Sequence, residues 1–186
     1  MKPPTLTRPA PVLTKENLKY LKLHSTLKLQ QELVPNSCWF SNVRSEVRDK
    51  DWDIIRRSVY ARENFLCEIC GGKGTKHPVE CHEVWNYDDV TFIQRLEGFR
   101  ALCPLCHEVK HMGLAGIRGN GPRAMERFES MNELDRATSR KITTAILEQW
   151  FIRCKHEWTL DISYLKEYGI DWDVLKNKKQ LKNKIK

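Results

Sequence analysis

The sequence lacks a long hydrophobic run. No stretch of about 18 or more apolar residues occurs, so no membrane-spanning helix and no membrane partner are expected. The first ten residues, MKPPTLTRPA, are rich in proline and lack the apolar core of a secretory signal peptide. We therefore expect a cytoplasmic protein. In that compartment the seven cysteines are expected to be zinc ligands and free thiols rather than disulfides.

Acidic residues are in short supply relative to basic ones. The chain of 186 residues has 24 Asp and Glu against 32 Lys and Arg, which gives a net charge of +8. Such an excess favours a polyanionic partner such as nucleic acid. A soluble surface accounts for the charge equally well, and part of the excess lies in the tail 176–186. Charge alone therefore does not decide the function.

The order of apolar and turn-forming residues predicts an α+β fold. We expect an N-terminal extension (1–48), a central core (49–116), a helical C-terminal region (117–175) and a basic tail (176–186). The helices are expected at 51–64, 106–114, 122–134 and 136–154, and the extended segments at 79–85, 90–95 and 99–102. Residues 14–34 are ambiguous, because their leucines fit a helix first and then an alternating strand at 27–30. Asn86 to Asp89 is expected to end the segment 79–85. Trp52, Ile55 and Val59 would share the buried face of the first of these helices.

Four cysteines form two pairs with the same short spacing. Cys67 and Cys70 make one Cys-x-x-Cys pair, and Cys103 and Cys106 make the other. Each such turn presents two thiolates, and Zn²⁺ takes four sulfur ligands in a closed tetrahedral site. The sequence therefore predicts a structural zinc site. The long gap between the two pairs exceeds that of an ordinary zinc ribbon.

Three histidines surround the second cysteine pair. His107 and His111 are four residues apart, so a helix would bring both imidazoles to one face, where they can bind a second metal ion. His82 lies in the predicted segment 79–85 and is free to act as a general base. Glu80 would share a strand face with His82 and could orient its ring.

Residues 67–113 resemble the HNH endonuclease superfamily, the ββα-metal nucleases. In that superfamily a metal ligand at the end of the first strand is followed by the general-base histidine, and this pair falls on Cys81 and His82. The metal-binding histidines of the motif helix fall on His107 and His111. Members with a zinc site carry Cys-x-x-Cys pairs at the places of the two pairs here. The resemblance therefore implies a ββα-metal core stabilised by a four-cysteine zinc site.

Two positions depart from the superfamily pattern. The asparagine that braces the loop holding the base would fall on Gly98, and Asn86 or Gln94 are the candidates to replace it. The ligand before the base is usually Asp or His, and here it is Cys81, whose thiolate suits Zn²⁺ better than Mg²⁺. The identity of the catalytic ion therefore stays open among Mg²⁺, Mn²⁺, Ni²⁺ and Zn²⁺.

The resemblance implies a metal-dependent endonuclease that hydrolyses phosphodiester bonds, with DNA as the expected substrate and a role in phage defence as one setting. Arg95, Arg100 and Lys110 are candidate phosphate contacts, and surface solvation is an equal alternative for each. The competing interpretation is a catalytically inactive, zinc-ribbon-like protein that binds nucleic acid or assembles a complex. In either case the two terminal extensions are candidate sites for a protein partner.

Overall fold

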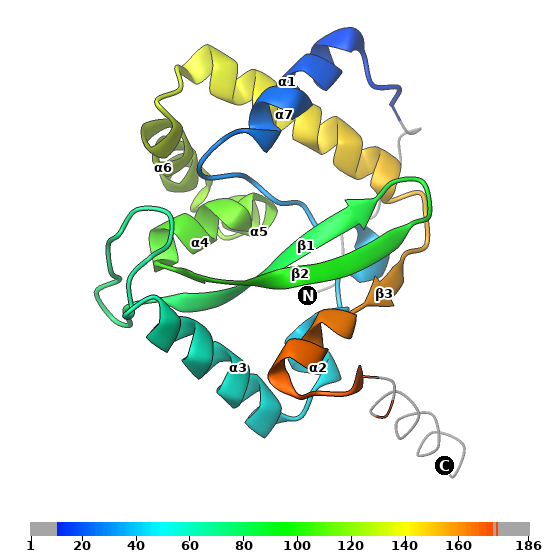
Figure 1. Ribbon diagram of the computed structural model, residues 1–186. Coiled ribbons are helices and arrows are strands. Elements are labelled where there is room, and N and C mark those ends of the chain that lie inside the picture. The colour runs from blue at the N-terminus through cyan, green and yellow to red at the C-terminus, as the bar shows by residue number, and fades with distance from the viewer. Residues whose placement is uncertain (1–10, 173, 175–186) are drawn as a thin grey trace.

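The computed structural model describes residues 11–172 and residue 174 (Figure 1). The basic tail predicted at 176–186 lies outside the described residues. Within them no helix is both long enough and apolar enough to cross a bilayer. In chain order the elements are α1 (Lys15–Ser25), the 3-10 helix η1 (Asn36–Cys38), α2 (Val43–Glu46), α3 (Asp49–Arg62), β1 (Glu80–Asp88), β2 (Ile93–Leu102), α4 (Pro104–Lys110), α5 (Met112–Ile117), α6 (Gly121–Asn132), α7 (Arg136–Arg153), β3 (Thr159–Asp161) and the 3-10 helix η2 (Ser163–Tyr168).

A long hairpin forms the centre of the fold. β1 pairs antiparallel with β2, and the short β3 adds to the far edge of β2 in parallel, so the described sheet has the order β1-β2-β3. The predicted end of the first strand at Asn86 is wrong, because β1 continues to Asp88. The two predicted extended runs of residues 90–102 are one strand. The register is irregular between Val84 and Trp85, where β2 has one extra residue. Pairing of β1 with β2 continues on both sides of this irregularity.

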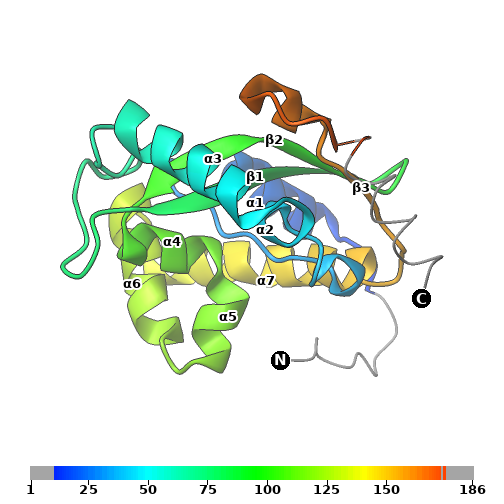
Figure 2. The ribbon, with the colours of Figure 1, turned by 90° about the horizontal axis from the view of Figure 1, so that it is seen from below.

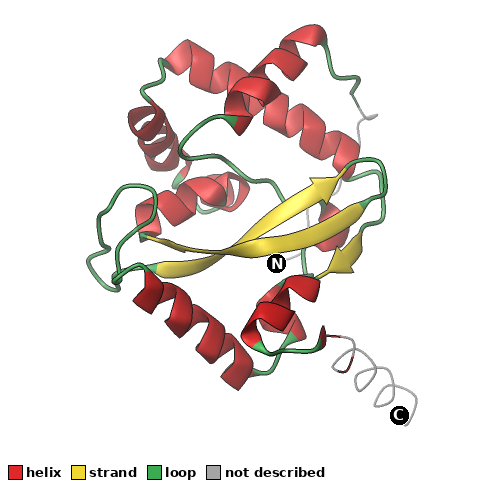
Figure 3. Ribbon diagram, viewed as in Figure 1, coloured by secondary structure: helices red, strands yellow, loops and turns green. Residues whose placement is uncertain are grey.

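Helices cover both faces of the hairpin (Figures 1, 2 and 3). On one face lie α1 and α4 to α7, and on the other lie α2, α3 and η2. Each face has its own buried core. The first contains Leu29, Ile69, Leu102, Val109, Phe128, Ile142 and Ile146 together with three cysteines. The second contains Val43, Ile55, Val59, Val79, Leu96, Phe99, Ala101, Ile162, Leu165 and Ile170. Alternation along β2 produces this division, since Ala101 and Leu102 point to opposite cores.

The helices α3, α6 and α7 agree closely with their predicted ranges. In α3 the predicted face is confirmed, with Ile55 and Val59 buried and Trp52 packed beside them. The helices predicted at 122–134 and 136–154 are α6 and α7. The mixed α and β character of the chain is therefore confirmed, and the long α7 packs against α1 across the first core (Figure 2).

The segment between α1 and η1 differs from its prediction. Residues 27–30 were expected as a strand, but this segment joins no strand of the described sheet. Its backbone is bound by side chains and helix ends instead. Asn132 in α6 accepts from Leu29 N and donates to Leu29 O, and Glu32 N donates to the carbonyl of Lys110 at the end of α4. These bonds hold residues 26–35 against the helical layer, and Leu29 is fully buried there.

The helix predicted at 106–114 is two shorter helices. α4 starts directly after Cys103, with Pro104 at its first position, and it ends at His111, whose ψ of 45° leaves the helical range. α5 then continues in a new direction from Met112. His111 therefore lies at the corner between the helices, while its backbone N–H still bonds His107 O at 3.2 Å.

Candidate metal centres

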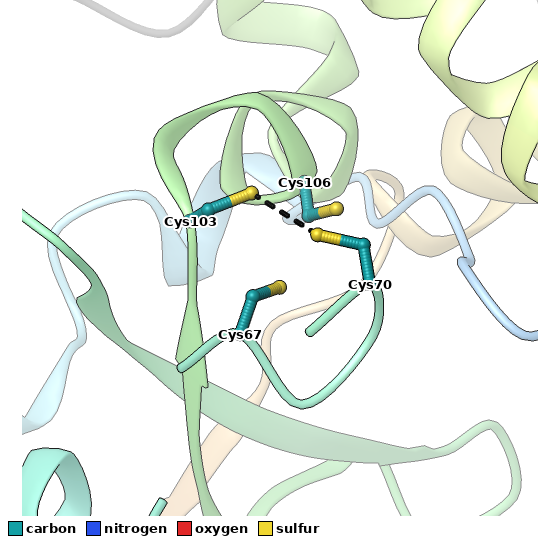
Figure 4. Close-up of side chains that lie close together, drawn as sticks. All are labelled: Cys67, Cys70, Cys103 and Cys106. Carbon is teal, nitrogen blue, oxygen red and sulfur yellow. Dashed lines mark hydrogen bonds between the residues drawn. The ribbon is translucent and has the colours of Figure 1, made fainter. Parts of the chain in front are cut away.

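Four cysteines meet at the base of α4 (Figure 4). We refer to Cys67, Cys70, Cys103 and Cys106 as the tetracysteine cluster. Their Sγ atoms all lie within 4.8 Å of one another, and three of the four residues are buried. A tetrahedral zinc ion with Zn–S bonds of about 2.3 Å would set sulfur atoms about 3.8 Å apart. The separation of Cys70 Sγ and Cys103 Sγ is 3.7 Å. The cluster therefore fits a structural metal ion such as zinc.

Local backbone geometry presents the thiols. Cys67 O accepts from Gly71 N at 2.8 Å and Cys67 N donates to Gly72 O at 3.0 Å, so the first pair lies on a closed turn. Gly71 has a φ of 69°, a left-handed conformation that a side chain would strain. Outside the turn, Arg127 of α6 donates from Nη2 to Cys106 Sγ at 3.3 Å. A guanidinium thus faces a group of sulfurs that would be anionic when bound to metal.

Three histidines converge beside this cluster. We refer to His82, His107 and His111 as the histidine cluster. His82 comes from β1, His107 from α4 and His111 from the corner after α4, and their ligand nitrogens lie within 4.8 Å of one another. The Nε2 atoms of His107 and His111 are 3.1 Å apart. Two nitrogens on one tetrahedral ion, with metal–nitrogen bonds of about 2.0 Å, would be about 3.3 Å apart. The arrangement is therefore compatible with a shared ion.

Burial favours the neutral form of His82 and of His111. His82 is only 3% exposed, and this burial is the main cause that lowers its pKa below the ordinary value. Burial also lowers the pKa of His111 to about 3, with further lowering by the neighbouring charge of His107. A neutral imidazole has a free lone pair, which is the form that binds metal ions. Both rings are thus in the ligand form at neutral pH.

Glu80 orients His107, and not His82 as the strand alternation alone suggested. One carboxylate oxygen of Glu80 accepts from His107 Nδ1, and the other accepts from His77 Nε2 at 2.6 Å. The hydrogen bond from His107 is the largest cause that lowers the pKa of Glu80, to about 2. Because Nδ1 of His107 carries the proton, its Nε2 keeps the lone pair that faces His111. Carboxylate–histidine pairs of this kind fix the tautomer of metal-binding histidines.

Glu32 has the corresponding role for His82, and sequence reasoning missed it. Its Oε2 accepts from His82 Nε2 at 3.1 Å, and its Oε1 accepts from Lys110 Nζ at 2.6 Å. Burial acts to raise the pKa of Glu32, but the contacts of its carboxylate with His82 and Lys110 outweigh it and lower the pKa to about 2. Glu32 is 50 positions away from His82 along the chain. No spacing or motif connects the two, so the sequence contains no signal for this contact.

The structure does not bring Cys81, the expected third ligand, into the histidine cluster. Neighbouring residues of a regular strand face opposite ways. His82 faces the helical layer with α4, whereas Cys81 packs with the second core on the other face of the hairpin. Burial raises the pKa of the Cys81 thiol to about 12, so it stays protonated. Its side chain belongs to the packing beneath α3.

Of the three predicted phosphate contacts, Arg100 is the one that pairs with His82 in the hairpin. The two residues are directly opposite one another in the hairpin, so their side chains lie on one face. Lys110 is 3% exposed and holds Glu32, so its ammonium group faces inward. Arg95 lies near the other end of the strand and donates to Asp161 of β3 at 3.0 Å. Lys110 is paired with Glu32 in the interior and Arg95 is paired with Asp161, so neither side chain is directed at the open end of the histidine cluster.

The bracing amide expected from the resemblance is not found next to the cluster. Gly98 lies opposite Val84 at the irregular register, and a Cβ there would sit 3.7 Å from the hydroxyl of Tyr164. Gln94 is buried and donates to the Tyr87 hydroxyl at 3.5 Å, beyond the irregularity. Asn86 is exposed in the same distal part of β1. Glu80 and Glu32 are the groups that brace the histidine rings.

No protein-family model, no curated protein and no solved structure matches the chain.

Proposed function

We propose that this chain is a metal-dependent phosphodiesterase that cleaves nucleic acid internally, with DNA as the first substrate to test, and that its central hairpin and α4 form an HNH-like ββα core. One observation carries the proposal. A histidine from the hairpin and two from the following helix bring their ligand nitrogens within 4.8 Å of one another. The order of these parts, strand, strand and helix, is the order that the resemblance to the ββα-metal nucleases requires.

In this proposal a divalent ion is held by His82, His107 and His111. His82 replaces Cys81 as the third ligand, because its ring lies in the cluster and the thiol lies on the other face. Three histidines leave a fourth tetrahedral position open, which is typical of catalytic rather than structural zinc sites. The general-base role expected for His82 stays a prediction. A His82→Ala protein that keeps the ion would indicate the base role, and one that loses the ion would indicate the ligand role.

The chain's own residues orient the ligands and the phosphate. A bound divalent ion supplies Lewis-acid stabilisation of negative charge on a phosphoryl group and a lower pKa for water. Glu80 and Glu32 each accept a hydrogen bond from the protonated ring nitrogen of one histidine. The other ring nitrogen of that histidine therefore keeps its lone pair for a metal ion. Arg100, across the hairpin from His82, is the cation available on this face to contact a phosphate oxygen. The net charge of +8 would attract the polyanion.

The tetracysteine cluster has a positioning role in the same proposal. Cys106 and His107 are adjacent in α4, and Cys103 directly precedes its first residue. A zinc ion on the four sulfurs would anchor the start of α4 to the turn at Cys67 and Cys70. That anchoring would fix the direction of His107 at the open end of the histidine cluster, where its side chain is 22% exposed.

A second candidate function is a non-catalytic zinc protein that binds nucleic acid or assembles a complex through its terminal regions. The deep burial of His82 favours it, because a structural ion needs no access to substrate. The two candidates differ in one measurable property. A structural histidine site would be needed for folding, whereas a catalytic one would be needed for cleavage only.

The test is cleavage of a supercoiled plasmid with Mg²⁺, Mn²⁺, Ni²⁺ and Zn²⁺ in turn. We expect nicked or linear product with the wild type, and a loss of at least about 100-fold in rate for His107→Ala with its circular dichroism unchanged. His156→Ala is the matched control, because His156 stacks on Phe92 outside the cluster. Single-stranded DNA and RNA in parallel identify the preferred substrate. Equal rates for wild type and His107→Ala, or no product with any ion, would contradict the proposal.

A further inference from the structure

A cavity of about 320 Å³ lies between the helical layer and the distal part of the hairpin. It is enclosed by the end of α1 and residues 30–33, by the distal half of β1 and by the last turns of α7. Its lining includes Gln30, Gln31, Glu32, Trp85, Gln149 and Trp150. Glu32 lines this cavity and also binds His82, so one side chain contacts both the cavity and a residue of the histidine cluster.

The charged groups of the cavity are already compensated inside the protein. Glu32 binds His82 and Lys110, and Arg153 donates two hydrogen bonds of 2.7 Å to Asp89. His24 is neutral, because burial lowers its pKa to about 4. A phosphate or a carboxylate entering the cavity would therefore lose hydration without gaining a free cation. The lining favours an uncharged ligand or the uncharged part of a larger one.

The remaining lining combines aromatic rings with amide groups. The indole N–H of Trp150 donates to Val34 O at 2.8 Å, and that of Trp85 donates to Glu83 at 3.2 Å. Because both indole donors are engaged elsewhere, these rings offer apolar surface to the cavity. The amide groups come from Gln30, Gln31, Gln149 and Asn86. Three of them donate from Nε2 to other groups of the protein: Gln30 to Ser25 O, Gln31 to Thr143 and Gln149 to Asp89 at 3.5 Å. Their carbonyl oxygens remain as acceptors.

We propose that this cavity binds one nucleobase of the substrate strand, next to the phosphate that the histidine cluster would engage. A flat, uncharged heterocycle with several donors and acceptors matches a wall of rings and amides, as in the sites where proteins take up unpaired bases. The volume falls at the small end of ligand cavities and suits a single base with its sugar. The inference rests on the proposed function for its substrate, a nucleic acid strand. It adds that the strand has an unpaired base at this position.

The direct test uses uncharged nucleosides and isothermal titration calorimetry. Adenosine, guanosine, cytidine and thymidine are titrated separately into the full chain. We expect saturable binding of at least one of them. Gln149→Ala, which removes one amide from the cavity wall, should weaken this binding by roughly fivefold. Thr144→Ala, on an exposed face of the same helix, is the matched control and should leave it unchanged. His111→Ala should also bind the nucleoside, since His111 does not line the cavity.

A second test places the base next to the cleaved bond. Single-stranded oligonucleotides with one abasic position, moved along the strand, are compared with the intact strand. We expect slow cleavage only at the bond flanking the missing base, and Gln149→Ala should reduce this difference. Cleavage at equal rates with and without every base, or no saturable binding of any nucleoside, would overturn the nucleobase site. Nucleoside binding without cleavage of any nucleic acid would support the site and contradict the phosphodiesterase instead.

Discussion

The tetracysteine and histidine clusters are neighbours in space but differ in how the chain builds them. The first is made by one short turn and by the start of α4, each of which supplies two ligands from residues three apart. The second takes one ligand from a strand, one from a helix and one from the corner between two helices, and carboxylates from two further places hold the rings. The first cluster is closed by its own four sulfurs. The second has three ligands and depends on distant parts of the chain for its geometry.

This difference predicts that the first cluster is needed for stability and the second only for the proposed cleavage. A site whose four ligands come as two close pairs can fold its own neighbourhood when it binds metal. A site with three ligands from separate elements forms only after the hairpin, α4 and residues 26–35 have packed together. Changes to the first cluster should therefore unfold the central region, and changes to the second should leave the fold in place.

The largest expected effect is the loss of the tetracysteine cluster. Cys106→Ser should leave the central region unfolded at 25 °C, because metal binding at such a site contributes on the order of 10 kcal/mol to folding. Cys154→Ser is the matched control, since Cys154 lies outside both clusters and a hydroxyl can still accept from Asn36 N. Circular dichroism and amide exchange of α4 report the outcome. A folded Cys106→Ser protein without bound zinc would show that the tetracysteine cluster is not needed for folding.

The next effect concerns the acid stability of the segment that supplies Glu32. His24 Nε2 accepts from Gln31 N at 2.9 Å, and burial lowers the pKa of His24 from 6.5 to about 4. Between these values the unfolded chain binds a proton that the folded chain does not, so the free energy of unfolding falls as the pH falls. The loss for this one group approaches roughly 3 kcal/mol by about pH 4.

His24→Gln should remove this contribution, because an amide oxygen can accept from Gln31 N and does not titrate. Urea unfolding of wild type and variant at several pH values between about 7 and 4 gives the comparison. The exposed His77→Gln serves as control. An identical pH slope for wild type and His24→Gln would show that His24 is not held neutral by burial.

A smaller effect is expected from Glu32. Glu32→Gln should lower the affinity of the histidine cluster for a divalent ion by roughly 10- to 100-fold, the usual cost of losing a carboxylate partner of a ligand histidine. The substitution also leaves the ammonium of Lys110 buried without its anion. The double variant Glu32→Gln with Lys110→Met removes that charge and should restore the thermal stability without restoring the affinity. If the double variant regained both, Glu32 would have only a structural role.

The smallest effect is expected at Arg127, where α6 meets the tetracysteine cluster. Arg127→Met removes the donor to Cys106 Sγ and should speed the release of zinc to a coloured chelator by roughly fivefold, the value of about one hydrogen bond. Arg123→Met is the control, since Arg123 binds Glu108 at the surface and not the sulfurs. Equal release rates for the two variants would mean that the guanidinium does not stabilise the thiolates.

Local spacing determined how much of the site the sequence could predict. The four cysteines and the pair His107 and His111 follow from residue spacing, because a turn or a helix brings such neighbours together. The presence of His82 beside them followed from the resemblance. Glu32 could not be found, because its position depends on how residues 26–35 pack across α4. Cys81 was misplaced because the resemblance outweighed the simple alternation of a strand.

The same rule applies to the fold. The amphipathic patterns of α3, α6 and α7 predicted these helices, since each buries one face. The predicted hairpin is too short, because the polar residues from Asn86 to Asp89 predict the end of the first strand. Pairing with β2 continues through Asp88, and the irregular register near Val84 that permits it is not visible in the residues themselves.

The most direct measurement counts the metal ions held by each folded chain, together with plasmid cleavage. The wild type should hold one ion at each of the two clusters. The double variant His107→Ala with His111→Ala should retain the ion of the tetracysteine cluster and its fold, and it should lose both the other ion and the cleavage activity. A wild type with an ion only on its cysteines, or a double variant that still cleaves, would contradict the account.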